Sequence, residues 1–365
     1  MSTYDKYTRD PGRETWDLTM AGDTRFTWEY DDGRDRLLSL YQKGKDKQWD
    51  STKRIDWSIE VDPVNPAGFP DEYNAFHGSS IWERMNQREQ DQLLQHISAW
   101  TFSQFLHGEQ GAMVTSARLV EAVPDLDAKF YAATQTMDEA RHVETFARFL
   151  QEKVGVVYPM NDNLGSLLSD ALSSSDWDFA YLGMQVLIEG LALAAFGVYR
   201  DIATNALAKQ LLAYVMQDEA RHVAFGRIAL RDHYAELSDK ERGEREDFVV
   251  EGCWLMRNRF LAQDVYDNLG LPVDECLQVA EQSQLQQYFR SLLFSRIVPC
   301  VRDIGLWGEK VQKCYADMGV LDMAGVDLDA LMRGDEELAE KLDADRLGLQ
   351  RRAEEVHETI AAAAD

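Results

Sequence analysis

The hexapeptide Asp-Glu-Ala-Arg-His-Val occurs twice in the chain, at residues 138–143 and 218–223, and it contains residue types that bind transition metals. A glutamate also stands thirty residues before the glutamate of each copy, so three potential ligands recur with a constant offset of eighty residues. Four carboxylates and two imidazoles in this order are the ligands that a four-helix bundle uses to hold two metal ions. The two sets are Glu109, Glu139 and His142, and Glu189, Glu219 and His222.

The spacing within each set fits an antiparallel helical hairpin. Positions i and i+3 lie one turn apart on one helix face, so Glu139 and His142 can reach the same point. Thirty residues separate Glu109 from Glu139. With a short turn in the middle, each of the two antiparallel helices has about fifteen residues, or about 22 Å, so the two glutamates lie at the same height in the bundle. The second copy repeats this geometry. Two such hairpins place all six ligands around one centre.

The donor types favour iron or manganese over a structural zinc site, because such zinc sites are closed and rich in thiolates. Four carboxylates balance the charge of two divalent ions, which is what an apolar interior requires. Glu189 interrupts residues 184–196, which are apolar nearly all round. An unpaired carboxylate there would cost several kcal/mol. We therefore predict two iron ions, and the ligand types also allow a mixed manganese and iron pair.

Asp138 and Asp218 each precede a ligand glutamate. They are either surface acids or hydrogen-bond partners of the histidine in the opposite motif, with Arg141 and Arg221 pairing with them. We favour the second interpretation, because such outer partners fix the tautomer and orientation of a metal-binding histidine.

Small residues flank the two upstream glutamates, which fits either close helix packing or a cavity beside the metals. Side chains one helical turn from the ligands would line such a cavity with apolar surface and one amide, which predicts a non-polar or aromatic small-molecule substrate. These residues are Phe105, Met113, Phe146, Gln185 and Leu193.

Sparse glycine and proline, with 23 and 8 among 365 residues, indicate an all-α chain. Capping residues and prolines delimit four long bundle helices and one short helix. The long helices are expected from Ser80 to about Val123, then to about Val154, from Trp177 to about Thr204, and from Ala206 to about Leu237, with the short one near Leu164–Leu172.

The expected organisation is one domain with an arm and a tail. Residues 1–75 form an N-terminal arm that packs on the core and holds a short helix near 34–45, and residues 76–240 form the bundle. Residues 241–325 add helices to the same domain, about 244–269 and 273–318, the second interrupted near Pro299. Residues 326–365 form an acidic C-terminal helix or tail.

The net charge of −26 makes binding to nucleic acid or to an anionic membrane surface improbable. Its simplest explanation is a solvated surface, and the alternative is an acidic face for a basic electron-transfer partner. The four cysteines show no paired spacing and are expected to be buried thiols. No targeting segment and no apolar span of about twenty residues is evident, so we expect a cytoplasmic protein.

From about Ser80 to Tyr234, the chain resembles the ferritin-like carboxylate-bridged di-iron proteins. Its repeated Asp-Glu-x-Arg-His motif is most similar to the soluble bacterial monooxygenase hydroxylases and the acyl-carrier-protein desaturases. The resemblance implies a four-helix bundle with one iron per ligand set and some bridging carboxylates. It also implies dioxygen as co-substrate, electrons from an external reductase or ferredoxin, and commonly a homodimer.

Three positions depart from relatives of this class. Phe146 stands where ribonucleotide reductase has its radical tyrosine, which argues against that activity. Leu193 replaces a threonine of the monooxygenases, and Val215 replaces a third histidine of the arylamine N-oxygenases. The expected order is therefore hydroxylation, then desaturation, then N-oxidation. A ferritin-like ferroxidase without organic substrate is a further alternative, opposed by the long chain beyond the bundle.

Overall fold

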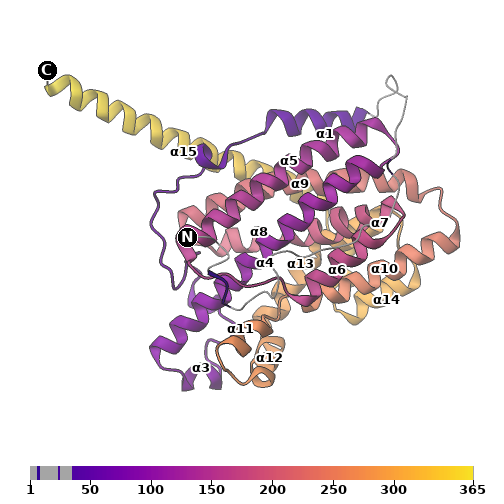
Figure 1. Ribbon diagram of the computed structural model, residues 1–365, viewed down its shortest axis with the longest axis horizontal. Helices are drawn as coiled ribbons and strands as arrows, with labels where there is room; N and C mark the ends of the chain where they lie inside the picture. Colours follow the sequence, from indigo (N-terminus) through magenta and orange to yellow (C-terminus); the bar gives the residue numbers. More distant parts are fainter. Residues whose placement is uncertain (1–5, 9–23, 25–34, 365) are drawn as a thin grey trace.

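The computed structural model describes residues 6–8, 24 and 35–364. These residues form an all-α fold without β-strands (Figure 1), which confirms the expected helical bundle. Most of the first half of the predicted N-terminal arm lies outside the described residues.

Four long helical segments make the core. They pack as two hairpins, α4 with α5 and α8 with α9. Asp125 begins α5 by accepting a hydrogen bond from the backbone of Ala128 at 2.9 Å, and Asn205 caps α9 in the same way. The segments are α4 (Gln87–Ala122), α5 (Leu126–Phe149), the run of α7 (Trp177–Tyr181), η4 (Leu182–Ile188) and α8 (Glu189–Ile202), and α9 (Ala206–Tyr234).

The predicted first helix is two helices. The short α3 (Ser80–Arg84) ends where Met85 adopts an extended conformation. The next residue, Asn86, starts α4 through a capping box with Glu89, in which each side chain accepts a hydrogen bond from the backbone of the other. The prediction of one helix from Ser80 is therefore wrong, and the capping residues that explain the break are readable in the sequence.

Two π-helical stretches modify the bundle helices. The first, η3 (Leu150–Val154), ends α5 at Gly155, whose φ is +79°. The second, η4, lies directly before Glu189 in the third long segment. Because a π turn contains one residue more than an α turn, it rotates the faces that follow it. The facing of residues on either side of η4 therefore differs from what regular helical spacing predicts.

Further helices cover the bundle, and three expectations about them need correction. The expected helix at about 244–269 is broken at residues 259–262, and the expected helix at about 273–318 is broken at Ser283 and at residues 304–308. The expected interruption near Pro299 is wrong, because Pro299 lies inside α13, whose buried residues Ile297, Val298 and Val301 outweigh one lost backbone hydrogen bond. The elements are α6 (Asp162–Ser173), α10 (Asp239–Asn258), α11 (Gln263–Asn268), α12 (Val273–Gln282), α13 (Gln284–Asp303), α14 (Glu309–Asp317) and η5 (Leu321–Gly325).

The N-terminal arm contributes three short helices around the bundle, and the C-terminal part ends in one long helix. From the arm, α1 (Asp35–Asp46) packs on α5 and α9, and α2 (Ser51–Arg54) and η2 (Asp71–Tyr73) follow it. The C-terminal helix α15 (Leu328–Ala364) packs on α9 with its first part and then projects away from the body (Figure 1). Asp335 anchors it by pairing with Arg296 at 2.6 Å and Arg200 at 3.4 Å, and all three side chains are buried.

The segment Trp177–Ile202 is long and apolar enough to cross a membrane, contrary to the expectation that no stretch would be. However, 89% of its most apolar window is buried inside the protein, as expected for a central bundle helix. The four cysteines are free and buried, which confirms their predicted state.

Gly226→Ala is expected to destabilise the fold by about 1–3 kcal/mol, because the added methyl would lie 2.5 Å from the Cβ atom of Gln185 and the packed helices cannot separate freely. Gly334→Ala is the matched control, since a methyl there meets open space and adds helix propensity in α15. Urea unfolding of both variants measures the effect. Equal stability of the two variants would contradict this packing.

Candidate metal centre

The six predicted ligands lie together in the bundle interior. Each hairpin contributes one glutamate from its first helix and a glutamate and a histidine from its second. None of the six is more than 4% exposed. They are Glu109 on α4, Glu139 and His142 on α5, Glu189 at the start of α8, and Glu219 and His222 on α9.

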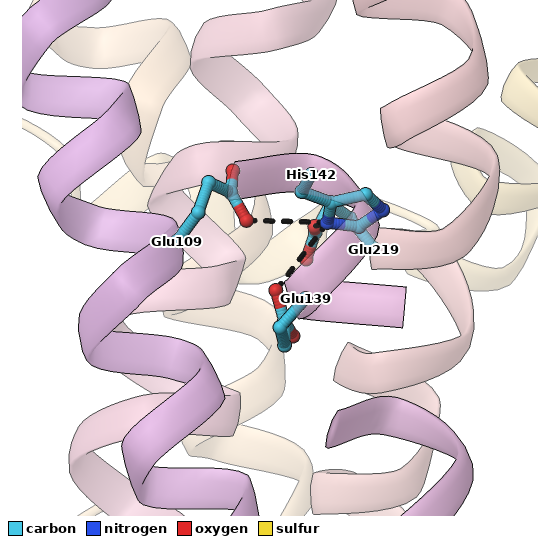
Figure 2. Close-up of side chains that lie close together, drawn as sticks. All are labelled: Glu109, Glu139, His142 and Glu219. Atoms are coloured by element: carbon cyan, nitrogen blue, oxygen red, sulfur yellow. Dashed lines mark hydrogen bonds and ion pairs between the residues drawn. The ribbon is translucent and has the colours of Figure 1, made fainter. Parts of the chain in front are cut away.

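The donor atoms form two overlapping groups, each with all of its atoms within 4.8 Å of one another. Glu139 and Glu219 belong to both groups, so they occupy the position of bridging ligands. Glu109 and His142 complete one group (Figure 2), and the same relation holds for Glu189 and His222 in the other.

The two histidines face the cluster with the same ring nitrogen. The Nδ1 atom of His142 lies 3.2 Å from Glu109, 3.3 Å from Glu139 and 3.0 Å from Glu219. The Nδ1 atom of His222 lies 3.0 Å from Glu139 and 3.1 Å from Glu219. Nδ1 is therefore the nitrogen placed to bind metal in both histidines.

The other ring nitrogen of each histidine meets the aspartate of the opposite motif. The Nε2 atom of His142 is 3.1 Å from Asp218, and that of His222 is 3.4 Å from Asp138. This is the crossed arrangement that we inferred from the repeat. An aspartate at this place holds the ring orientation and keeps the proton on Nε2, which leaves Nδ1 free for a metal.

Arg141 and Arg221 link the two aspartates. Arg141 donates to Asp138 at 2.6 Å and to Asp218 at 2.7 Å, and Arg221 donates to Asp218 and lies 3.5 Å from Asp138. Because all four side chains are buried, each charge depends on its partners for compensation. The four residues therefore form a layer of compensating charges behind both histidines.

Two residues of the N-terminal arm complete this layer. Trp49 donates its indole N–H to Asp218 at 2.8 Å, and Gln48 donates to Asp138 at 2.6 Å while accepting from Arg141 at 2.7 Å. No motif marks these two residues in the sequence. Only the packing of the arm against α5 and α9 brings them to the site.

A second unforeseen residue, Gln135, connects ligands of both hairpins. Its amide donates to Glu139 at 3.0 Å and to Glu189 at 3.2 Å, and its carbonyl oxygen accepts from Gln185 at 2.7 Å. Gln135 stands four residues before Glu139, on the same helix face. That spacing is a signal from which it could have been found.

Of the residues predicted to line a substrate pocket, Phe105 and Phe146 lie close together, with ring centroids 5.8 Å apart, and both contact Phe196. Leu193 is fully buried, Met113 is half-buried, and Gln185 is bound to Gln135. The structure therefore places an aromatic cluster one turn from the predicted ligands Glu109 and His142, and the pocket itself stays a prediction.

The cluster cannot hold four ionised carboxylates by itself. Burial and the charges of neighbouring glutamates raise the pKa values of Glu109 and Glu189 well above the usual range. Burial opposes ionisation of Glu139 as well, but the two histidines hold its pKa well below the usual range. Burial also disfavours charge on both histidines, yet the surrounding carboxylates raise the pKa values of His142 and His222.

Two divalent cations fit this donor set. One oxygen of Glu139 and one of Glu219 are buried and make no hydrogen bond of regular geometry among the described residues, although they lie 3.3 and 3.0 Å from the Nδ1 atom of His142. These two glutamates are the residues shared by both groups. Buried polar atoms are rarely left unsatisfied without a functional reason. Metal ions would satisfy them and replace the protons as the neutralising charge.

Metal binding is expected to release protons, about one from each of His142, His222, Glu109 and Glu189, because all four have raised pKa values and must be deprotonated to bind. Apparent affinity for Fe²⁺ should therefore rise with pH through neutrality. Anaerobic titration of the metal-free protein with Fe²⁺ in weakly buffered indicator solution measures the release. An affinity that does not depend on pH would contradict these protonation states.

The bundle and its buried cluster of four carboxylates and two histidines define a ferritin-like di-iron oxygenase. The chain matches the family described as P-aminobenzoate N-oxygenase AurF over residues 31–305, and it therefore belongs to that family. This confirms the predicted class of enzyme and its iron-type cofactor.

Solved structures with a similar arrangement include the R2-like ligand-binding oxidase. Its form with an aerobically reconstituted metal cofactor after photoconversion is 18% identical, with a TM-score of 0.46, and the match covers 77% of this chain and 95% of that one. A variant with an anaerobically reconstituted Mn/Fe cofactor is 17% identical, with a TM-score of 0.47 and the same coverage. No curated protein matches the chain.

Proposed function

We propose that this di-iron oxygenase oxidises the amino group of a small aromatic amine. The observation that carries the proposal is the family match. It begins just before α1, includes the whole bundle, and extends through α13. It favours N-oxidation over the hydroxylation that the sequence motifs favoured. The aromatic cluster of Phe105, Phe146 and Phe196 beside the ligands supports an aromatic substrate.

In this proposal Glu109, Glu139 and His142 hold one iron, and Glu189, Glu219 and His222 hold the other. When bound, the metal pair supplies the two-electron activation of dioxygen. One oxygen atom enters an N–H bond to give a hydroxylamine and the other leaves as water, with two electrons and two protons supplied from outside.

The protein side chains position and insulate this chemistry. Asp138 and Asp218 hold the two imidazole rings, so that each ring can keep its direction as the metal charge changes. Gln135 holds Glu139 and Glu189 at a fixed separation through its amide group. The aromatic cluster keeps bulk water from the side of the centre formed by α4 and α5.

Hydroxylation of a C–H bond is the second candidate, and Val215 favours it. This residue is fully buried at the place where the resemblance to arylamine N-oxygenases implies a third histidine. It offers no donor, so the predicted ligand set has six residues, as in the monooxygenase hydroxylases. Desaturation is the third candidate, after N-oxidation and C–H hydroxylation.

An external reductase or ferredoxin is the proposed electron donor, and the net charge of −26 suits a basic face on such a partner. We also propose a homodimer in the cytoplasm. Phe130 and Met137, which are 40% and 62% exposed, lie seven residues apart on one face of α5 and support a contact there.

The test is a single turnover of the iron-loaded, chemically reduced protein with dioxygen and either p-aminobenzoate or 4-methylbenzoate. Chromatography with mass detection is expected to show the hydroxylamine of the first compound. Ring or methyl hydroxylation without N-oxidation would instead establish the second candidate. Iron oxidation with neither product would favour a ferroxidase.

A further inference from the structure

A cavity of about 460 Å³ is built by helices that carry none of the predicted metal ligands. Its volume is in the range of small-molecule sites. Arg257 near the end of α10, Glu281 at the end of α12, Arg290 on α13 and the turn at residues 318–320 line it. The predicted metal ligands lie on α4, α5, α8 and α9, so the cavity and the metal centre are separate features of the fold.

Two cations face this cavity without a matching acid. Arg257 and Arg290 are both half-buried, and among the described residues neither guanidinium has a carboxylate oxygen within 4.0 Å. Arg257 lies over the ring of Trp254, 5.2 Å from its centroid, and Arg290 donates to the backbone carbonyl of Glu281 at 3.0 Å. These contacts hold the side chains in place but do not neutralise their charges.

The two guanidinium groups are close enough to repel each other. Burial and, next, the charge of Arg257 lower the pKa of Arg290, while the carboxylate of Glu281 opposes this change. This uncompensated pair stands in a chain whose acidic residues outnumber its basic ones by 64 to 38. An anion between the two arginines would remove the repulsion and compensate both charges.

One side of the cavity is apolar. This apolar wall consists of Phe294 and Val320, which are buried, and Met318, which is half-buried. An apolar cavity of about 150 Å³ holds a benzene molecule, so the space here accommodates an anionic group together with an organic part of at least that size. The lining therefore fits an organic anion better than a bare inorganic ion.

We propose that Arg257 and Arg290 together bind the phosphate group of a small phosphate monoester, and that its organic part packs against the apolar wall. A phosphate monoester carries a charge of about −1.5 to −2 at pH 7 and has three acceptor oxygens, so one group can accept hydrogen bonds from two guanidinium groups. A carboxylate carries a single charge and would compensate only one arginine. The inference goes beyond the proposed oxidation, because this site shares no residue with the metal centre.

Isothermal titration calorimetry of the iron-loaded full chain tests the site with phenyl phosphate, phenyl sulfate and inorganic phosphate. Wild type is expected to bind phenyl phosphate roughly tenfold or more tightly than either of the others, because the sulfate ester has a single charge and inorganic phosphate lacks the organic part. Arg257→Gln and Arg290→Gln should each weaken binding of phenyl phosphate by roughly tenfold or more. Arg88→Gln is the control, since it makes the same charge change at an exposed position of α4.

Glu281→Gln gives a result that misfolding cannot imitate. It removes the one acid among the described lining residues, while the backbone carbonyl that accepts from Arg290 remains. Phenyl phosphate should therefore bind roughly threefold more tightly than to wild type. Asp274→Asn is the matched control, because Asp274 is an exposed acid in the first turn of the same helix.

Tighter binding to Glu281→Gln, together with weaker binding to both arginine variants, would support the site. The inference fails if wild type binds phenyl phosphate no more tightly than phenyl sulfate or inorganic phosphate, a comparison that needs no variant. It also fails if both arginine variants bind as wild type does, because the phosphate would then lie on the metal ions or on another cation. Unchanged or weaker binding to Glu281→Gln would equally overturn it.

Discussion

Glu219→Ala is expected to abolish iron-dependent oxidation. Glu219 is one of two carboxylates shared by both groups of donor atoms, so its loss would remove a proposed ligand from each of the two metal positions. The decrease should exceed the roughly 10- to 100-fold loss that follows removal of an outer partner of a metal ligand. Measured iron after anaerobic loading should fall well below two per chain.

The helical fold of Glu219→Ala should survive, because the change removes one acid from a buried group of four whose charges repel one another. Circular dichroism and urea unfolding of the metal-free protein would show this. Glu144→Ala is the control, since Glu144 is an exposed glutamate two residues after His142. Full activity and iron content in the Glu219 variant would refute the assignment of this centre.

Asp218→Ala is expected to cause the largest loss of stability, about 3–5 kcal/mol, together with a roughly 10- to 100-fold weaker affinity for iron. Asp218 accepts hydrogen bonds from Trp49, Arg141 and Arg221 and holds His142. Its removal leaves the buried positive charges of Arg141 and Arg221 with one acidic partner fewer. Urea unfolding of the metal-free protein and iron titration measure the two effects separately.

The pH dependence of this effect has a definite sign. Burial would raise the pKa of Asp218, but Arg221, His142 and Arg141 hold it well below the usual range. Its contribution is therefore fully present above the unfolded pKa of about 3.9, and it is lost as the pH falls through the lower folded-state value. The difference in stability between wild type and variant should shrink in acid.

Asp138→Ala is the matched comparison, because Asp138 holds the equivalent position in the first motif. Its contacts to His222 at 3.4 Å and Arg221 at 3.5 Å are longer, and it lacks a tryptophan donor. We expect a smaller loss of stability than for Asp218. A larger loss would show that the arm residue Trp49 contributes little to this layer.

The sequence determined the centre because its repeat encodes helical geometry directly. Glu139 and His142 share a face through local periodicity, and the offset of eighty residues duplicates that face in the second hairpin. The crossed contacts of Asp138 and Asp218 follow from the same symmetry. A local period and a two-fold repeat therefore sufficed to predict the bundle and the class of enzyme.

Tertiary structure alone decided which residues surround this centre. Gln48 and Trp49 reach it from the arm, about ninety residues before the first motif, and no period relates them to the ligands. The π-helix η4 changes which residues face the bundle interior just before Glu189. Regular helical spacing is therefore not a valid basis for predicting which residues of this segment line a pocket. Contacts between distant segments depend on how whole helices pack, and that packing is a collective property of the folded chain rather than of any local pattern.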